Sequence, residues 1–180
     1  MYSAVRRHPH VVHTNKAPGF EESHGRFAFA SKRLWVGADG KSISCSWYEV
    51  PPGKQAFPHH FHSAVEEAVF VLEGKGATRI GDERIPISAG DYITYPPGPA
   101  SAHSIINTSD EPLRYLCMST VTDMDIIVYP DSNKISFGSG FDPAKTPQEQ
   151  TPWIAKIIRD QPSIGYYDGE DGESDASKGK

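Results

Sequence analysis

Three histidines lie within four positions in the segment PHHFHSAVEEAVFVLEG, residues 58–74. Side chains two positions apart on a β-strand point to the same face, so His60 and His62 project together and His59 projects the other way. Two imidazoles on one face can bind a divalent ion if further ligands arrive from neighbouring strands. The two glutamates that follow are candidates, but the strand period alone does not choose between them. The alternative is a polar turn between two strands.

Short strands separated by Pro- and Gly-rich turns surround this segment. Apolar runs and alternating patterns predict strands at residues 43–48, 68–72, 77–80, 84–87, 92–95, 103–107, 113–120 and 126–129. The sequence Gly81-Asp82-Glu83 predicts a hairpin between two of them. Turn signals recur at intervals of roughly 8 to 12 residues, which is typical of an all-β sandwich or barrel.

The two ends of the chain have different patterns. Apolar residues recur at helical spacing over residues 153–158, with Thr151 at the N-cap and Pro152 at the first helical position, which predicts a short C-terminal helix. Residues 1–25 are polar and His-rich and are interpreted as an N-terminal arm, while residues 26–168 form a single domain. Residues 169–180 are predicted to be a disordered acidic tail.

Composition excludes several classes of function. The chain has 180 residues, a formal net charge of -5 and 37% hydrophobic residues, as expected of a globular domain without a basic surface for nucleic acid. We find no run of 18 apolar residues and no apolar segment of a signal peptide near the N-terminus, so we expect no membrane span and a cytoplasmic location. The two cysteines, Cys45 and Cys117, are interpreted as buried thiols.

Two motifs in the right order resemble those of the cupin superfamily. The first combines Gly53, His60-Phe61-His62, Glu67 and Gly74. Its final spacing, six residues from Glu67 to Gly74, selects Glu67 over Glu66. The spacer before His60 is one residue longer than is usual in the family. This resemblance implies that His60, His62 and Glu67 are metal ligands.

The second motif consists of Gly90, Pro96-Pro97-Gly98, His103 and Asn107. The spacer between Gly98 and His103 is longer than in the usual pattern, so the loop before His103 is wider. The resemblance covers residues 43–120. It implies a double-stranded β-helix, also called a jelly roll, with His103 as the fourth ligand of a metal inside one mouth of the barrel.

The resemblance also implies function. Three imidazoles and one carboxylate suit a divalent transition metal, Zn, Mn, Fe, Ni or Co. Such a site predicts a metal-dependent enzyme acting on a small oxygen-rich metabolite (a sugar, sugar phosphate or related acid) as an isomerase or lyase. The alternatives are an Fe- or Ni-dependent dioxygenase and a non-catalytic binding or sensor module. Members of the family commonly form homodimers, which is the expectation here.

A reaction that moves a carbon-bound proton also needs a polar group beside the metal. The candidate catalytic residues on the predicted strands are Tyr48, Arg79, Tyr92 and Tyr95. Each is also compatible with a packing or surface role. Glu66 and His59 are expected to face away from the site. No nucleophile elbow, phosphate-binding loop or dinucleotide fingerprint occurs.

Overall fold

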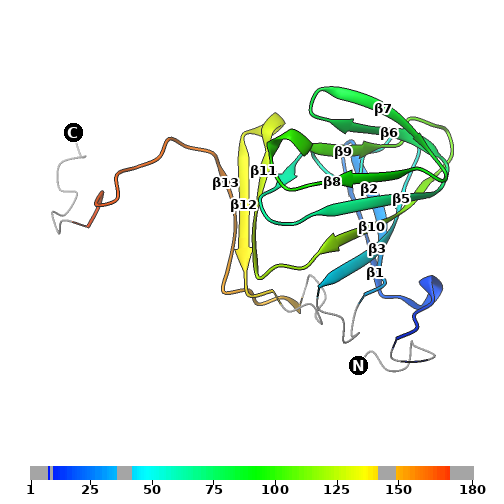
Figure 1. The fold of residues 1–180 in the computed structure, drawn as a ribbon, viewed down its shortest axis with the longest axis horizontal. Coiled ribbons are helices and arrows are strands. Elements are labelled where there is room, and N and C mark those ends of the chain that lie inside the picture. Colours follow the sequence, from blue (N-terminus) through cyan, green and yellow to red (C-terminus); the bar gives the residue numbers. More distant parts are fainter. Residues whose placement is uncertain (1–7, 9, 36–41, 142–148, 171–180) are drawn as a thin grey trace.

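The computed structural model describes residues 8, 10–35, 42–141 and 149–170, which form antiparallel strands joined by turns and short 3-10 segments (Figure 1). The strands are β1 (Gly19–His24), β2 (Phe27–Arg33), β3 (Ile43–Val50), β4 (Phe61–His62), β5 (Glu67–Glu73), β6 (Lys75–Ile80), β7 (Glu83–Ser88), β8 (Tyr92–Tyr95), β9 (His103–Ile106), β10 (Leu113–Thr120), β11 (Met124–Tyr129), β12 (Lys134–Ser139) and β13 (Ile154–Arg159). The 3-10 segments are η2 (Thr14–Lys16), η3 (Pro99–Ser101) and η4 (Pro130–Ser132).

These strands build three sheets. The largest has the order β1-β2-β3-β10-β5-β8, the second β13-β12-β11-β4 and the third β7-β6-β9. Their arrangement is the predicted double-stranded β-helix, and the prediction of an all-β fold is confirmed. The part of the chain that the structure describes contains no helix long and apolar enough to cross a membrane.

The alternation of buried and exposed side chains along β5 shows which face of this strand looks into the barrel. Val69 and Val71 are buried in the core, whereas Phe70 and Leu72 on the opposite face are exposed. Glu67 begins the strand in phase with the two valines, so its side chain starts on the face that looks into the barrel. The remaining core is contributed by both layers: Phe29, Val50, Ala56, Ile87, Tyr95, Ile105, Leu113 and Tyr115.

The N-terminal region contributes one strand. Within the segment predicted to be an arm, β1 pairs antiparallel with β2 over its whole length and forms an edge of the six-stranded sheet. In the predicted acidic tail, residues 171–180 lie outside the described residues.

The prediction of a C-terminal helix is wrong. Residues 154–159 form β13, which pairs antiparallel with β12 from Ile154 opposite Ser139 to Arg159 opposite Lys134. The residues at helical spacing are largely β-branched isoleucines, which favour strands. A helix of this length is marginal in water, whereas the free edge of β12 satisfies the backbone of β13 with ladder hydrogen bonds.

Gly74 is a position where the fold requires glycine. Its backbone has a φ of +88°, and a Cβ there would overlap the carbonyl oxygen of Pro112. We expect Gly74→Ala to lower the free energy of unfolding by about 2–4 kcal/mol, because left-handed strain and a backbone clash add. Gly53→Ala is the matched control, since Gly53 has a φ of +68° but open space around it. Gly53→Ala should lower the free energy of unfolding by about 1 kcal/mol. If urea denaturation shows that both variants lose the same free energy of unfolding, the clash with Pro112 does not contribute at Gly74.

Candidate metal centre

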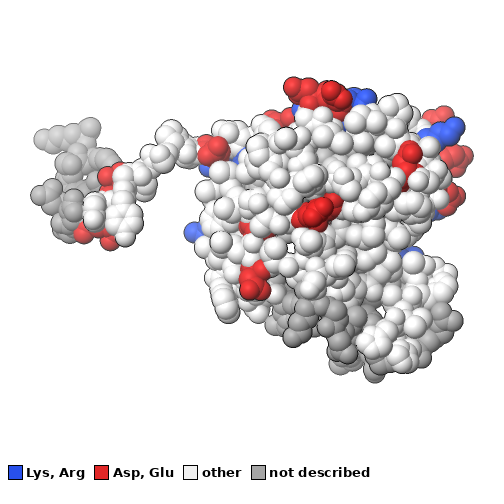
Figure 2. Space-filling model, viewed as in Figure 1, with Lys and Arg blue, Asp and Glu red and all other residues white. Residues whose placement is uncertain are grey.

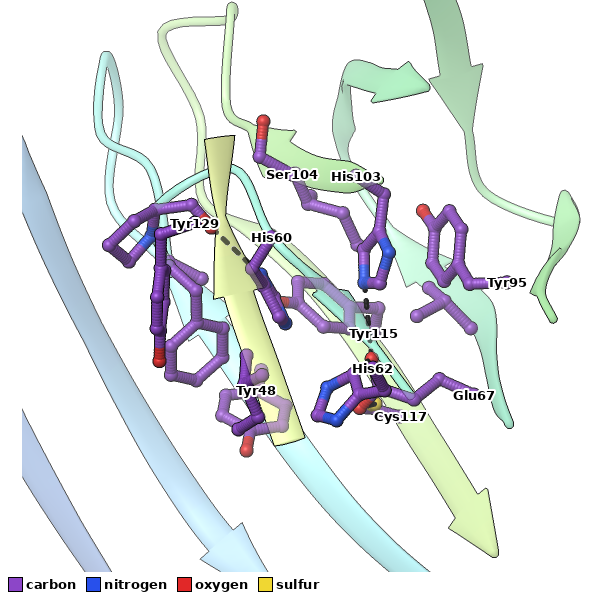
Figure 3. Close-up of a pocket in the computed structure, with 16 residues that line it drawn as sticks. Tyr48, His60, His62, Glu67, Tyr95, His103, Ser104, Tyr115, Cys117 and Tyr129 are labelled. Atoms are coloured by element: carbon purple, nitrogen blue, oxygen red, sulfur yellow. Dashed lines mark hydrogen bonds and ion pairs between the residues drawn. The ribbon is translucent and has the colours of Figure 1, made fainter. Parts of the chain in front are cut away.

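A cavity of about 310 Å³ opens inside the barrel, between β5 and β10 on one side and β11 on the other (Figure 3). We call it the chamber. Its described lining comprises Tyr48, Ala56, Phe57, Pro58, His60, His62, Glu67, Val69, Tyr95, His103, Ser104, Ile105, Tyr115, Cys117, Ile127 and Tyr129. All four residues expected to be metal ligands are in this set.

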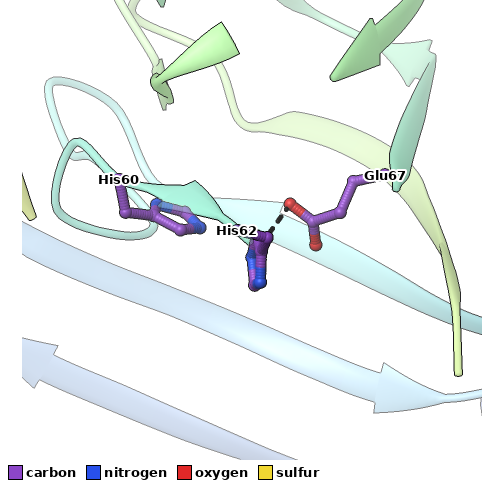
Figure 4. Close-up of side chains that lie close together, drawn as sticks. All are labelled: His60, His62 and Glu67. Atoms are coloured by element: carbon purple, nitrogen blue, oxygen red, sulfur yellow. Dashed lines mark ion pairs between the residues drawn. The ribbon is translucent and has the colours of Figure 1, made fainter. Parts of the chain in front are cut away.

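His60, His62 and Glu67 form the tightest group of possible ligands (Figure 4). One ligand atom from each lies within 4.8 Å of the others. Nε2 of His62 is 3.5 Å from Oε2 of Glu67. The two histidines share one face of the short stretch around β4, as their spacing in the sequence predicts. This group could hold a metal ion.

His103 reaches the same carboxylate from β9. Its Nε2 lies 3.1 Å from Oε2 of Glu67. The imidazole ring stacks on Tyr95 with 3.6 Å between ring centroids and 4° between planes, so it has little freedom to turn. The backbones of His103 and His60 exchange two hydrogen bonds of 2.7 and 3.0 Å, which join the start of β9 to the residue just before β4.

The outer nitrogens of the histidines are occupied. Nδ1 of His60 donates to the carbonyl of Pro58 at 2.8 Å. Nδ1 of His103 donates to the carbonyl of Ser101 at 3.0 Å. A carbonyl can only accept, so these contacts fix the tautomer that leaves Nε2 for the chamber. Such second contacts are a regular feature of histidines that bind metals.

The equivalent contact of His62 comes from a residue that the sequence did not single out. Oδ2 of Asp125, on β11, accepts a hydrogen bond from Nδ1 of His62 at 2.5 Å. The other carboxylate oxygen accepts from the amide of Ala64 at 3.0 Å and from the hydroxyl of Ser63 at 3.2 Å. Asp125 is therefore held in place by its own partners and orients His62 through a charge-assisted hydrogen bond.

The donor set fits a divalent transition metal. The oxygen of Glu67 is 3.1 and 3.5 Å from two imidazole nitrogens. Adjacent ligands around one ion lie about 3 Å apart when each bond is about 2.1 Å long. In addition, Nε2 of His103 faces the Glu67 carboxylate, so a cation between these two atoms would be bound by both.

Electrostatics favour the metal-binding forms of His60 and Glu67. Burial, together with the neighbouring His103, lowers the pKa of His60 to about 4, so the imidazole is neutral at pH 7. Burial alone would raise the pKa of Glu67, but the neighbouring imidazoles of His103, His62 and His60 outweigh it and lower the pKa to about 2. Neutral imidazole and ionised carboxylate are the states that a metal requires.

The four candidate catalytic residues divide into two pairs. Tyr48 and Tyr95 line the chamber. Arg79 does not, because its guanidinium bonds to Asp131 at 2.6 Å outside the barrel. Tyr92 is 62% exposed on the outer face of β8.

His59 and Glu66, which the strand phase predicts to face away from the metal site, are not among the described lining residues of the chamber. His59 is 3% exposed, and its pKa is lowered by burial and by the nearby Arg79. Glu66 is exposed, and its backbone rather than its carboxylate makes the hydrogen bonds to Thr120. This placement agrees with the strand phase on which the expectation rested.

Cys117 is a second residue near the ligands that had no assigned role. Its Sγ donates to Oε1 of Glu67 at 3.7 Å from β10. Burial and the Glu67 charge raise the pKa of this thiol well above its usual value, so it remains protonated. It therefore acts as a weak donor that helps to orient the carboxylate.

Comparison with known proteins identifies the domain. Residues 46–119 match the family described as Cupin domain. An uncharacterized protein of Methanocaldococcus jannaschii is 36% identical over 70 residues, which cover 39% of this chain and 54% of that relative. The match thus spans about half the length of this curated relative.

Two solved structures share the fold over most of the chain. One is a proposed sugar phosphate isomerase from Acidithiobacillus ferrooxidans, with a TM-score of 0.70 and 23% identity over 87% of this chain and 97% of that protein. The other is a sugar phosphate isomerase of the cupin superfamily from Silicibacter pomeroyi, with a TM-score of 0.67 and 19% identity over 81% of this chain and 89% of that protein.

A third structure, from Thermotoga maritima, is described as a predicted oxalate decarboxylase. It has a TM-score of 0.54 and 23% identity over 62% of this chain and 99% of that protein. At these identities the likeness concerns the fold. The family match identifies residues 46–119, which carry the core of the double-stranded β-helix, as a cupin domain.

Proposed function

We propose that this protein is a metal-dependent enzyme acting on a small oxygen-bearing metabolite, as an isomerase or lyase. The observation that carries the proposal is the convergence of three imidazoles and the Glu67 carboxylate in a chamber lined by apolar and aromatic side chains. Four protein donors leave two positions of an octahedral ion for oxygen atoms of a substrate.

The bound metal would polarise a carbonyl or hydroxyl group of the substrate as a Lewis acid. The chain's own residues supply the surroundings. Apolar side chains around the ligands exclude water, which strengthens every charge interaction inside. Burial raises the pKa of Tyr48 and Tyr95, so their hydroxyls stay protonated. They are therefore suited to donate hydrogen bonds rather than to abstract protons.

The similar structures support this class of reaction. Two are named as sugar phosphate isomerases and one as a predicted oxalate decarboxylase, so each concerns a small oxygen-rich molecule. The acidic surface agrees with a small-molecule partner. On the face in Figure 2, Lys and Arg do not gather into one continuous patch of the kind that binds nucleic acid.

A dioxygenase using Fe or Ni is the second candidate. The largely apolar lining favours it, since dioxygen is apolar and needs one of the two remaining metal positions. Oxygen consumption with a candidate substrate separates the two. An isomerase or lyase converts its substrate without consuming oxygen.

The decisive experiment is elemental analysis of untagged protein purified without added metal or chelator, followed by turnover assays on the same samples. We expect about one equivalent of a single transition metal. Product formation that tracks metal content would support the enzyme. Tight ligand binding without turnover would leave a binding module, and protein that takes up no metal even after reconstitution would end the proposal.

We further propose that the protein is a homodimer joined along β13. This strand is the edge of its sheet, and all six of its residues are exposed. Beyond it, residues 160–170 extend from the body on the same side, with Tyr166 89% exposed (Figure 1). A twofold antiparallel pairing centred on Ile157 places Lys156 opposite Ile158, so like charges stay apart.

Ile157→Glu is expected to give a monomer, because it would place two carboxylates opposite each other at the centre of this pairing. Light scattering after size exclusion measures the mass. Ile85→Glu is the matched control, since Ile85 is 41% exposed on β7 and lies outside the proposed interface. A wild-type protein that is monomeric at micromolar concentration would refute the interface.

A further inference from the structure

The charges around the chamber limit what it can hold. Among its described lining residues there is no Lys and no Arg, and Glu67 is the single acidic side chain. Arg79, which pairs with the lining residue Ser104 in the strand register, is not part of the lining and is engaged with Asp131. A phosphate brought into the chamber would therefore find no protein cation, and burying such an anion without a counter-charge is costly. Its one favourable partner would be the metal itself.

One hydroxyl of the chamber is already in use. Tyr95 shares a hydrogen bond of 2.8 Å with Thr78. The side chains of Ser31 and Ser46 act on the pKa of Tyr48 against the effect of burial. The hydroxyl of Tyr95 therefore has limited capacity left for a ligand.

Tyr129 and Ser104 also carry hydroxyls in the lining. The side chain of Ser136 acts on the pKa of Tyr129 against the effect of burial. The hydroxyl of Ser104 points away from His60 and His103 (Figure 3). Ser104 therefore offers no partner to a ligand hydroxyl near these histidines.

The remaining surface is flat and aromatic. Tyr48 stacks on Tyr115 with 5.4 Å between ring centroids, and Phe57 meets Tyr48 edge-on at 5.6 Å. Tyr129 lies 6.0 Å from His60 by ring centroids and closes the opposite side. Aromatic rings of a ligand pack well in such surroundings. The volume of about 310 Å³ is at the small end for ligand sites, which admits a compact molecule.

From these observations we infer that the chamber is selective for a compact, planar, uncharged ligand that offers adjacent oxygens to the metal and an apolar ring to Tyr48, Phe57, Tyr115 and Tyr129. Phosphorylated sugars are excluded as preferred ligands. This inference rests on the proposed function, because it needs a metal at the three histidines and Glu67. It predicts a substrate class other than the sugar phosphates after which two of the similar solved structures are named.

Ile127 offers a way to reverse the selectivity. It lines both the chamber and the larger groove outside it, and it pairs with His62 across the strand ladder. A lysine at this position can place its ammonium near the chamber while its stem stays on apolar surface. Ile126 is the preceding residue of β11, so its side chain faces the other way. It is 39% exposed, and Ile126→Lys therefore adds the same charge outside the chamber.

The test is calorimetric titration of the Co(II)-loaded protein with maltol, a planar uncharged hydroxyketone, and with ribose 5-phosphate and inorganic phosphate. For the wild type we expect maltol to bind at least tenfold more tightly than either phosphate compound. Ile127→Lys should reduce that ratio by at least tenfold, and Ile126→Lys should leave it unchanged. Changes in the Co(II) absorption spectrum show whether each ligand reaches the metal.

Elemental analysis of every sample separates the possible failures. Wild-type protein that holds no cobalt overturns the proposed function, and this inference with it. Cobalt-loaded wild type that binds ribose 5-phosphate as tightly as maltol overturns the selectivity alone and leaves the metal site intact. The wild-type comparison decides the question even if Ile127→Lys does not fold.

Discussion

His62→Ala is expected to reduce metal affinity by at least 100-fold while the barrel remains folded. Loss of an outer contact to a ligand typically costs 10–100-fold, and removal of the ligand itself costs more. His62 is central because its Nε2 faces Glu67 and its Nδ1 binds Asp125. Titration with Zn(II) or Co(II) measures the affinity, and circular dichroism checks the fold.

His59→Gln is the control for this substitution. His59 lies three positions earlier in the same segment but is not part of the described chamber lining, so its replacement should leave metal affinity unchanged. If His59→Gln and His62→Ala weaken binding equally, the assignment of ligands by strand phase is wrong.

Asp125→Asn should lower metal affinity by about 10–100-fold without removing a ligand. The amide keeps the size of the side chain but loses the charge that strengthens the hydrogen bond to Nδ1 of His62. We expect turnover to fall with metal occupancy and to recover in part at saturating metal. Recovery of this kind distinguishes a positioning residue from a ligand.

The matched control is Asp123→Asn. Asp123 is exposed on the loop before β11 and lines the outer groove rather than the chamber. The Asp123→Asn variant should bind metal with the affinity of the wild type. An equal loss in both variants would mean that general surface charge, and not the contact with His62, sets the affinity.

Much of this site could be predicted from the sequence because strands have a period of two. The shared face of His60 and His62 and the phase of Glu67 with Val69 follow from that period, and the chamber contains all three of these candidate ligands. The position of His103 depended on a motif with an unusual spacer. In the structure its backbone pairs with His60, which compensates for the longer loop.

Other features could not be found in this way. Asp125 is 63 residues from His62, and a single aspartate at the start of a strand carries no local signal. Its alternation with Ile127 and Tyr129 on one face of β11 was the available clue. The C-terminal segment was assigned the wrong period because its isoleucines fit both patterns, and pairing with β12 decided between them.

The paired backbones of His60 and His103 have a consequence for the rate at which a bound metal would leave. Two ligands distant in the chain share reciprocal amide hydrogen bonds, so neither can swing outward alone. Release would then require local opening of the barrel mouth, and chelators would remove metal at a rate set by the protein rather than by their own concentration. The amides of His60 and His103 should exchange with deuterium on the same timescale as this release.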